Sequence, residues 1–167
     1  MVLHLVAPLP YYFFEYISSY ILFWENFMDT SFTQPRPAML LMQQLYTEVF
    51  QQGNLALIET LFTPDFIDHS TPSQMPGPLG VATYVNEVRL GFPDLVVIIE
   101  DLIVEENKVV ARTTWSGTHL GFYEGIVPTG KRTCRTLIQI FSFVDGKIAE
   151  EWNEGNGMLA SLLTEHC

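Results

Sequence analysis

Residues 133–154, TCRTLIQIFSFVDGKIAEEWNE, carry the clearest signal of the fold. Its two halves are rich in β-branched and aromatic residues, and Asp145-Gly146 between them is a two-residue turn signal typical of a β-hairpin. The upstream runs 95–105 and 109–120 have the same composition. The sequence therefore predicts four long strands joined as an antiparallel meander.

Helices are expected upstream of these strands. Residues 38–54, AMLLMQQLYTEVFQQGN, place Leu41, Leu45 and Val49 at intervals of four, which predicts an amphipathic helix that ends at Gly53. The other elements expected outside the meander are a short helix over 55–62, a short strand over 65–70, a helix over 79–92 and a helical fragment over 159–163. Helices followed by antiparallel strands indicate an α+β fold in which helices cover one face of a curved sheet.

The first 37 residues differ in composition from the rest. Between residues 2 and 27 only two side chains are charged, and aromatic residues are dense. Three interpretations stay open: an extension upstream of a true start at Met28, an amphipathic or membrane-touching helix, and a helix docked on the domain. We favour the first, because the residues after Met28 resemble a disordered leader that ends in a Pro-rich linker. We therefore expect a leader over 1–37 and one domain over 38–167, with membrane contact only if the extension belongs to the mature protein.

The composition excludes several classes of protein. With 167 residues, 48% of them hydrophobic, the chain is long enough for one packed core. Its 8 basic and 19 acidic side chains give a formal net charge of −11, which would repel the phosphate backbone of a nucleic acid. Cys134 and Cys167 are not spaced as a disulfide framework or a zinc site. We therefore expect no nucleic-acid partner, no metal and a cytoplasmic location.

Four pieces of the sequence give the chain a specific resemblance. In order, they are YTEVFQQGNLALIETLFTPDFIDH, GFPDL, ARTTWSGTHLGFYEGIVPTGKR and IFSFVDGKIAEEWNEGN. On these pieces the sequence resembles the SnoaL-like polyketide-cyclase family, within the superfamily that includes nuclear transport factor 2 and ketosteroid isomerase. The match extends over residues 45–163, which is nearly the whole domain.

The resemblance implies a structure and a kind of chemistry. The fold would be a cone-shaped, curved antiparallel sheet with helices on its concave face, and its deep apolar pocket would bind a small apolar metabolite. The resemblance also implies homodimers that pack through the outer face of the sheet, and no cofactor. Family members with known chemistry close rings by aldol addition, with a carboxylate as acid and base.

Asp68 and His69 are candidate catalytic residues near the end of the short strand. Successive side chains of a strand point to opposite faces, so only one of the two faces the pocket. We expect His69 to point inward, because ketosteroid isomerase, which is similar here, carries its base at the end of the corresponding strand. A neutral imidazole also suits proton abstraction. The alternative is that both side chains only hydrogen-bond the backbone of the following turn.

The segment from Glu150 to Asn156 is the second candidate region. Strand alternation places Glu150, Trp152, Glu154 and Asn156 on one face. The resemblance implies a catalytic aspartate four residues after the tryptophan and a histidine just before it. These positions hold Asn156 and Glu151 here. We expect Asn156 to act as an oxyanion donor and Trp152 and Glu154 to bind substrate, with a solvated acidic edge of glutamates as the alternative.

Three further residues on the predicted strands are candidates for the site. His119 shares a strand face with Trp115, and it is either an auxiliary donor at the mouth of the pocket or a residue that satisfies backbone groups. Trp115 is expected to form, with Trp152, a wall for a planar apolar ligand. Arg135 either belongs to a solvated strand face or meets a ligand carboxylate.

These residues favour a cofactor-free enzyme that removes a proton next to a carbonyl group, in a cyclisation or an isomerisation, with His69 as the base. The alternative is a non-catalytic small-molecule-binding or dimerisation module of the same fold, which the asparagine at position 156 favours. The enzyme hypothesis requires a closed cavity onto which His69 and Asn156 converge.

Overall fold

The computed structural model describes residues 35–71 and 73–155. Its helical elements are α2 (Pro35–Gln43), the π-helix η1 (Gln44–Gln51), the 3₁₀-helix η2 (Leu55–Leu57), α3 (Ile58–Leu61) and α4 (Gly77–Gly91). Its strands are β1 (Phe62–Asp68), β2 (Val96–Glu105), β3 (Lys108–Thr118), β4 (Arg132–Val144) and β5 (Lys147–Glu154). The predicted α+β fold is confirmed, and the long elements lie close to their expected positions.

The strands form one sheet in the order β1-β5-β4-β3-β2. β2, β3, β4 and β5 make the predicted antiparallel meander. β1 instead runs parallel to β5, so the sheet is mixed where an entirely antiparallel one was expected. A parallel pair needs a long crossover connection, and here α4 and the first three strands of the meander lie between the two strands in sequence.

The hairpin between β4 and β5 turns at Asp145-Gly146, as predicted. The backbone φ angles are 50° at Asp145 and 76° at Gly146, so both residues are in the left-handed region. A two-residue hairpin turn of type I′ requires this conformation, which aspartate and glycine tolerate best. The turn residues therefore set where β4 ends and β5 begins.

A β-bulge interrupts the pairing of β5 with β4. The consecutive pairs Phe143–Ile148 and Ser142–Glu150 leave Ala149 as an extra residue on β5. An extra residue reverses the alternation of side chains between the two faces of a sheet. The residues of β5 that follow the bulge therefore face the side opposite to that expected from their spacing to Ile148.

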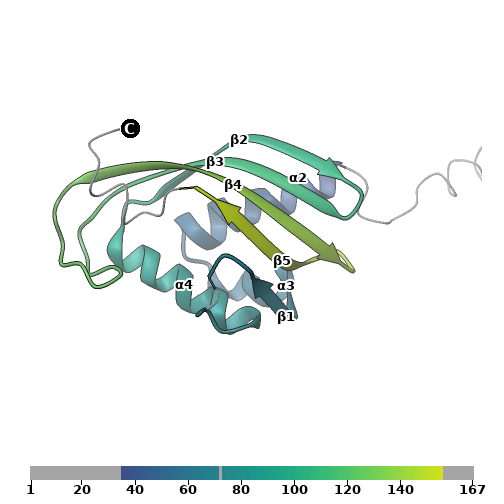
Figure 1. The fold of residues 1–167 in the computed structure, drawn as a ribbon, viewed down its shortest axis with the longest axis horizontal. Coiled ribbons are helices and arrows are strands. Elements are labelled where there is room, and N and C mark those ends of the chain that lie inside the picture. The colour runs from purple at the N-terminus through teal and green to yellow at the C-terminus, as the bar shows by residue number, and fades with distance from the viewer. Residues whose placement is uncertain (1–34, 72, 156–167) are drawn as a thin grey trace, which may run out of the picture. The chain divides into compact units, whose positions relative to one another are not determined.

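Helices pack against the concave face of the curved sheet, and the core lies between the two layers (Figure 1). On β3, Val109, Ala111, Thr113 and Trp115 are buried and alternate with more exposed residues. The helical layer contributes buried apolar residues from α2, η1 and α4. They are Ala38, Leu41, Met42, Leu45, Tyr46, Val49, Phe50, Val81, Val85 and Val88. A cavity between the two layers is described below.

The expected helix over 38–54 is divided into α2 and the wider π-helix η1. The Gln52 N–H donates to the carbonyl of Thr47, five residues back, and Gly53, with a φ of 76°, ends the helix. Arg89 on α4 donates to the carbonyl groups of Phe50 and Gln51. These contacts hold the end of η1, which carries part of the cavity wall, against α4.

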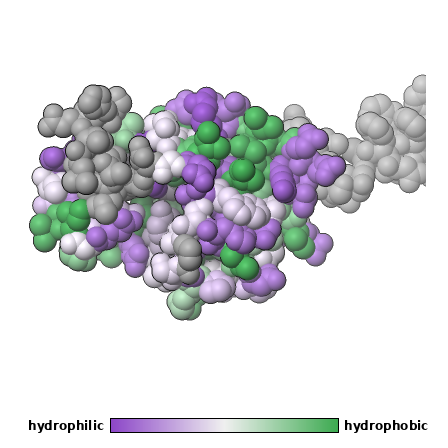
Figure 2. Space-filling view, in the orientation of Figure 1, coloured by the Kyte–Doolittle hydropathy of each residue, from purple (hydrophilic) through white to green (hydrophobic). Residues whose placement is uncertain are grey.

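The outer face of the sheet exposes apolar side chains. They are Val96, Ile98 and Ile103 on β2 and Ile138 and Ile140 on β4. Figure 2 shows hydrophobic side chains beside hydrophilic ones on the face of the molecule in view. The expected homodimer through the outer face stays a prediction.

Several expectations concern what the chain lacks or how it begins and ends. Among residues 35–71 and 73–155, no helix is both long and apolar enough to cross a membrane. In the same residues, no group of three or more His, Cys, Asp or Glu side chains is placed to hold a metal ion. The predicted leader over 1–37, apart from its last residues, and the helical fragment over 159–163 lie outside the described residues.

Candidate active site

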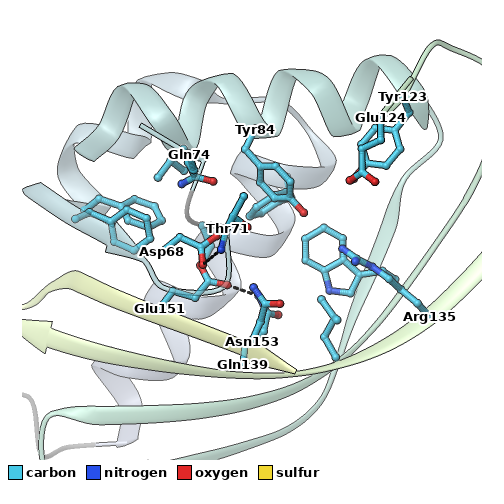
Figure 3. A pocket seen from close by; sticks show the side chains of 17 residues that line it. Asp68, Thr71, Gln74, Tyr84, Tyr123, Glu124, Arg135, Gln139, Glu151 and Asn153 are labelled. Carbon is cyan, nitrogen blue, oxygen red and sulfur yellow. Dashed lines mark hydrogen bonds between the residues drawn. The ribbon is translucent and has the colours of Figure 1, made fainter. Parts of the chain in front are cut away.

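A cavity of about 170 Å³ lies between the inner face of the sheet and the helices. One water needs only roughly 15 Å³ in the same measure, so the space suits an organic ligand. Its apolar wall consists of Leu45, Phe50, Phe62, Phe66, Val81, Trp115 and Leu137. Its polar side chains include Asp68, Tyr84, Glu124, Arg135, Gln139, Glu151 and Asn153 (Figure 3).

Glu151 is a cavity carboxyl group whose pKa is raised toward neutrality. It points into the cavity because the bulge in β5 turns it to the inner face. Burial, and to a lesser degree the charge of Asp68, raises the pKa of Glu151 from 4.5 to about 7. Hydrogen bonds with Gln139 and Asn153 and the charge of Arg135 act in the opposite direction. A carboxyl group with this pKa can both accept and return a proton near neutrality.

Gln139 holds the Glu151 carboxyl group through a buried chain of hydrogen bonds. Its Nε2 donates to Glu151 Oε1 at 2.8 Å. Its Oε1 accepts from the Tyr46 hydroxyl at 2.9 Å and from Thr113 Oγ1 at 3.1 Å, and the Trp115 indole donates to Thr113 Oγ1 at 2.9 Å. Because two hydroxyl groups donate to its oxygen, the amide can only donate toward Glu151. Glu151 Oε1 is therefore held as a hydrogen-bond acceptor.

We expect Gln139→Leu to destabilise the protein by about 2–4 kcal/mol, because each buried hydroxyl left without an acceptor costs about 1–3 kcal/mol. The affected hydroxyls are those of Tyr46 and Thr113. Urea unfolding measures the loss, with Gln44→Leu, at an exposed position of η1, as the matched control. Equal unfolding free energies for the two variants would contradict the network described here.

Asp68 faces the cavity at the end of β1, and its carboxylate also caps the following turn. Its Oδ1 accepts from the N–H of Ser70 at 2.8 Å and from the N–H of Thr71 at 3.2 Å. This local interaction is the alternative that was predicted for Asp68. The negative charge beside Glu151 favours the protonated form of that residue, which helps to keep its pKa high.

His69, Trp152 and Glu154 lie outside the cavity, and their expected inward orientation is wrong. The His69 side chain is 38% exposed, its Nε2 lies 3.2 Å from Glu150 Oε1, and its ring stacks on Trp152 with 4.6 Å between centroids. Glu154 is exposed on the same outer face. The reason on β1 is that Phe66 is buried, and strand alternation then turns the residue after Asp68 outward.

Three expected site residues remain, namely Trp115, His119 and Asn156. Trp115 is 1% exposed and lies in the cavity wall. His119 is buried away from the cavity, where its Nδ1 lies 3.1 Å from Thr129 Oγ1 and its ring lies 5.3 Å from that of Phe92. These contacts match the structural role given as the alternative for His119. Asn156 lies outside the described residues, so its role stays a prediction.

Four residues of the cavity were not predicted from the sequence, namely Glu151, Gln139, Asn153 and Tyr84. For Gln139 a signal was present, since it is a polar residue in an alternating row of inward-facing residues that are otherwise mostly apolar. For Glu151 the signal was that it occupies a position at which the resemblance implies a histidine. Asn153 and Tyr84 had no comparable signal, because one follows the bulge and the other belongs to a helix with apolar residues on several sides.

Comparisons with known proteins agree with this architecture. The model of the family described as SnoaL-like polyketide cyclase matches residues 40–160. The chain is also similar to a nogalonic acid methyl ester cyclase from Streptomyces nogalater, with 27% identity over 124 residues. That alignment covers 68% of this chain and 88% of the relative.

Two solved structures are similar to the whole described domain. TsrD from Streptomyces laurentii is 28% identical with a TM-score of 0.71, and the match covers 77% of this chain and 93% of TsrD. IdmH from Streptomyces antibioticus is 27% identical with a TM-score of 0.63, and the match covers 77% of this chain and 99% of IdmH.

Proposed function

The chain belongs to the SnoaL-like polyketide cyclase family, and on this basis we propose that it is a cofactor-free enzyme that cyclises or isomerises a small apolar carbonyl compound. The observation that carries the proposal is the Glu151 carboxyl group, which faces the cavity and has a pKa raised to about 7. General acid/base catalysis is most efficient when the pKa of the catalytic group lies near the working pH. Glu151, and not His69, is therefore the proposed acid and base.

The proposed reaction uses Glu151 twice. The ionised carboxylate takes a proton from a carbon atom next to a carbonyl group of the ligand. In a cyclisation, the resulting carbanion forms a C–C bond to a second carbonyl carbon, whose oxygen becomes an alkoxide. Glu151 then returns the proton to this alkoxide, so the reaction needs no external proton or electron. Trp115 is the proposed flat wall beside the reacting ring.

The residue types at positions 151 and 156 support this assignment. The resemblance implies a histidine where this chain has Glu151 and an aspartate where it has Asn156. A carboxyl group with a pKa of about 7 titrates in the same range as an imidazole. Glu151 can therefore supply proton transfer in a chain that has an amide at the position of the family's aspartate.

The function can be tested by deuterium exchange. Nogalonic acid methyl ester is the first test compound, because the relative from Streptomyces nogalater is named as its cyclase. The purified protein is incubated with the compound in D₂O, exchange is followed by NMR, and isomers of unchanged mass are sought by chromatography with mass spectrometry. Compounds extracted from the denatured protein are tested in the same way.

The expected result is protein-dependent deuterium incorporation at the carbon next to a carbonyl group, with or without ring closure. Exchange that matches the rate without protein, for every compound that binds, would contradict the enzyme and favour the non-catalytic binding module.

A further inference from the structure

The cavity has two chemically different ends. Asp68 and Glu151 lie at one end and Arg135 at the other (Figure 3). Arg135 precedes Gln139, the partner of Glu151, by four residues on β4. That separation is roughly 13 Å along a strand. The Arg135 side chain is buried, with 9% of the residue exposed. A buried cation therefore lies at the other end of the cavity from the proposed acid and base.

The guanidinium group of Arg135 contacts aromatic side chains. Its central carbon lies 5.1 Å from the centroid of the Trp115 ring, and it forms a side-chain hydrogen bond with Tyr84. Its Nε is buried without a hydrogen-bond partner. Within 35–71 and 73–155, no carboxylate lies within 4.0 Å of this group. The contact between His69 and Glu150 is on the outer face.

A buried charge is costly when no opposite charge is near it. Removing a guanidinium group from water without a carboxylate partner lowers the stability of the empty protein. A bound anion would supply the missing charge. The position of Arg135 in a cavity wall, and not in a closed core, gives such an anion a place to bind.

We propose that Arg135 binds a carboxylate group of the ligand and that the substrate is a planar carboxylic acid. The inference rests on the proposed function, because it concerns the same cavity. The guanidinium group presents parallel N–H donors that match the two oxygens of a carboxylate. Trp115, which lies against the guanidinium group, provides an aromatic wall for the flat ring system that carries this carboxylate.

The acidic residues of the cavity fix the direction of binding. Asp68 and Glu151 repel a carboxylate from their end. Glu124 lies at the Arg135 end of the cavity (Figure 3), but it is an exposed residue whose charge is screened by solvent. The carboxylate therefore lies at Arg135, and the carbon that loses its proton lies near Glu151. A methyl ester gains little from the guanidinium group, so the free acid is preferred.

The preference can be measured with two probes that share one ring system, 2-naphthoate and methyl 2-naphthoate. Isothermal titration calorimetry is performed on the full chain and on the variants Arg135→Met and Arg135→Gln. Arg132→Met is the matched control, because Arg132 is an exposed arginine of the same strand. We expect the unmodified protein and the control to bind the acid about 10–100-fold more tightly than the ester, as for hydrogen bonds to charged groups.

Both variants at Arg135 should lose this preference while keeping the affinity for the ester. Arg135→Gln retains a polar side chain, so it reports on binding even if methionine disturbs the fold. Equal affinity of the unmodified protein for the two probes, a preference that survives in both variants, or no binding of naphthoate at millimolar concentration would overturn the proposal.

The two proposals fail in different experiments. The binding measurement involves no turnover, and Glu151→Gln leaves Arg135 in place. If Glu151→Gln retains deuterium exchange, the proposed role of Glu151 is wrong whatever the probes show. If the acid and its ester bind equally while Glu151→Gln abolishes exchange, the function stands and the carboxylate site is wrong.

Discussion

Glu151→Gln should lower turnover of the carbonyl substrate by about 10²–10⁴-fold, the usual contribution of a general acid or base. Glutamine has nearly the same size, and its side-chain oxygen can still accept the hydrogen bond from Gln139 Nε2. It has no proton that titrates near neutrality, so ligand affinity should change little while proton transfer is lost. The measurement is deuterium exchange together with calorimetric binding.

Glu150→Gln is the matched control, because it makes the same change on the neighbouring residue. Glu150 lies on the outer face, where it accepts from Ser142 and pairs with His69. We expect its turnover to stay within about a factor of two of the unmodified protein. The pH profile of the unmodified protein should rise with an apparent pKa near 7, because the basic form of Glu151 starts the reaction. Equal turnover in Glu151→Gln and Glu150→Gln would remove Glu151 from the mechanism.

The same substitution should also change stability, by an amount that depends on pH. The pKa of Glu151 is raised in the folded state, from 4.5 to about 7, so between these values the folded protein holds a proton that the unfolded chain has released. The free energy of unfolding therefore falls as pH rises through this window, and the loss is complete above about pH 7. The full loss amounts to roughly 3 kcal/mol.

Glu151→Gln has no such loss. Its stability relative to the unmodified protein should thus grow from about zero near pH 4.5 to as much as about 3 kcal/mol above pH 7. Urea unfolding at a series of pH values measures the difference. Glu150→Gln should show no gain at high pH, since hydrogen bonds from Ser142 and His69 lower the pKa of Glu150. A difference between Glu151→Gln and the unmodified protein that is flat with pH would show that Glu151 is not shifted.

Much of the fold could be predicted from local sequence. On β3, buried and more exposed residues alternate as a half-buried strand requires, and the Asp145-Gly146 turn adopts the conformation that its residues favour. The helix over 38–54 was recognisable from the spacing of its apolar residues, although part of it is a π-helix. The parallel pairing of β1 with β5 had no local signal, because the two strands are joined by more than half of the domain.

The orientation of the site residues could not be predicted in the same way. On β1, Phe66 and Ile67 are both apolar, so the pattern does not say which of them faces the core, and it is Phe66 that is buried. On β5, Ile148 and Trp152 are separated by an even number of residues and would share one face in a regular strand. The bulge between them places Ile148 in the core and Trp152 on the outer face.

The α+β class, the four long strands and the family could all be predicted from the amino-acid sequence, because strand composition, turn residues and motif order are local properties of the chain. The orientation of Glu151 into the cavity, in place of His69 or Trp152, depends on tertiary contacts. One extra residue in β5 changes the face of every side chain after it, and the acidity of Glu151 depends on Asp68 of β1 and on Gln139 and Arg135 of β4. Such dependence on distant segments leaves no mark in the residues around Glu151.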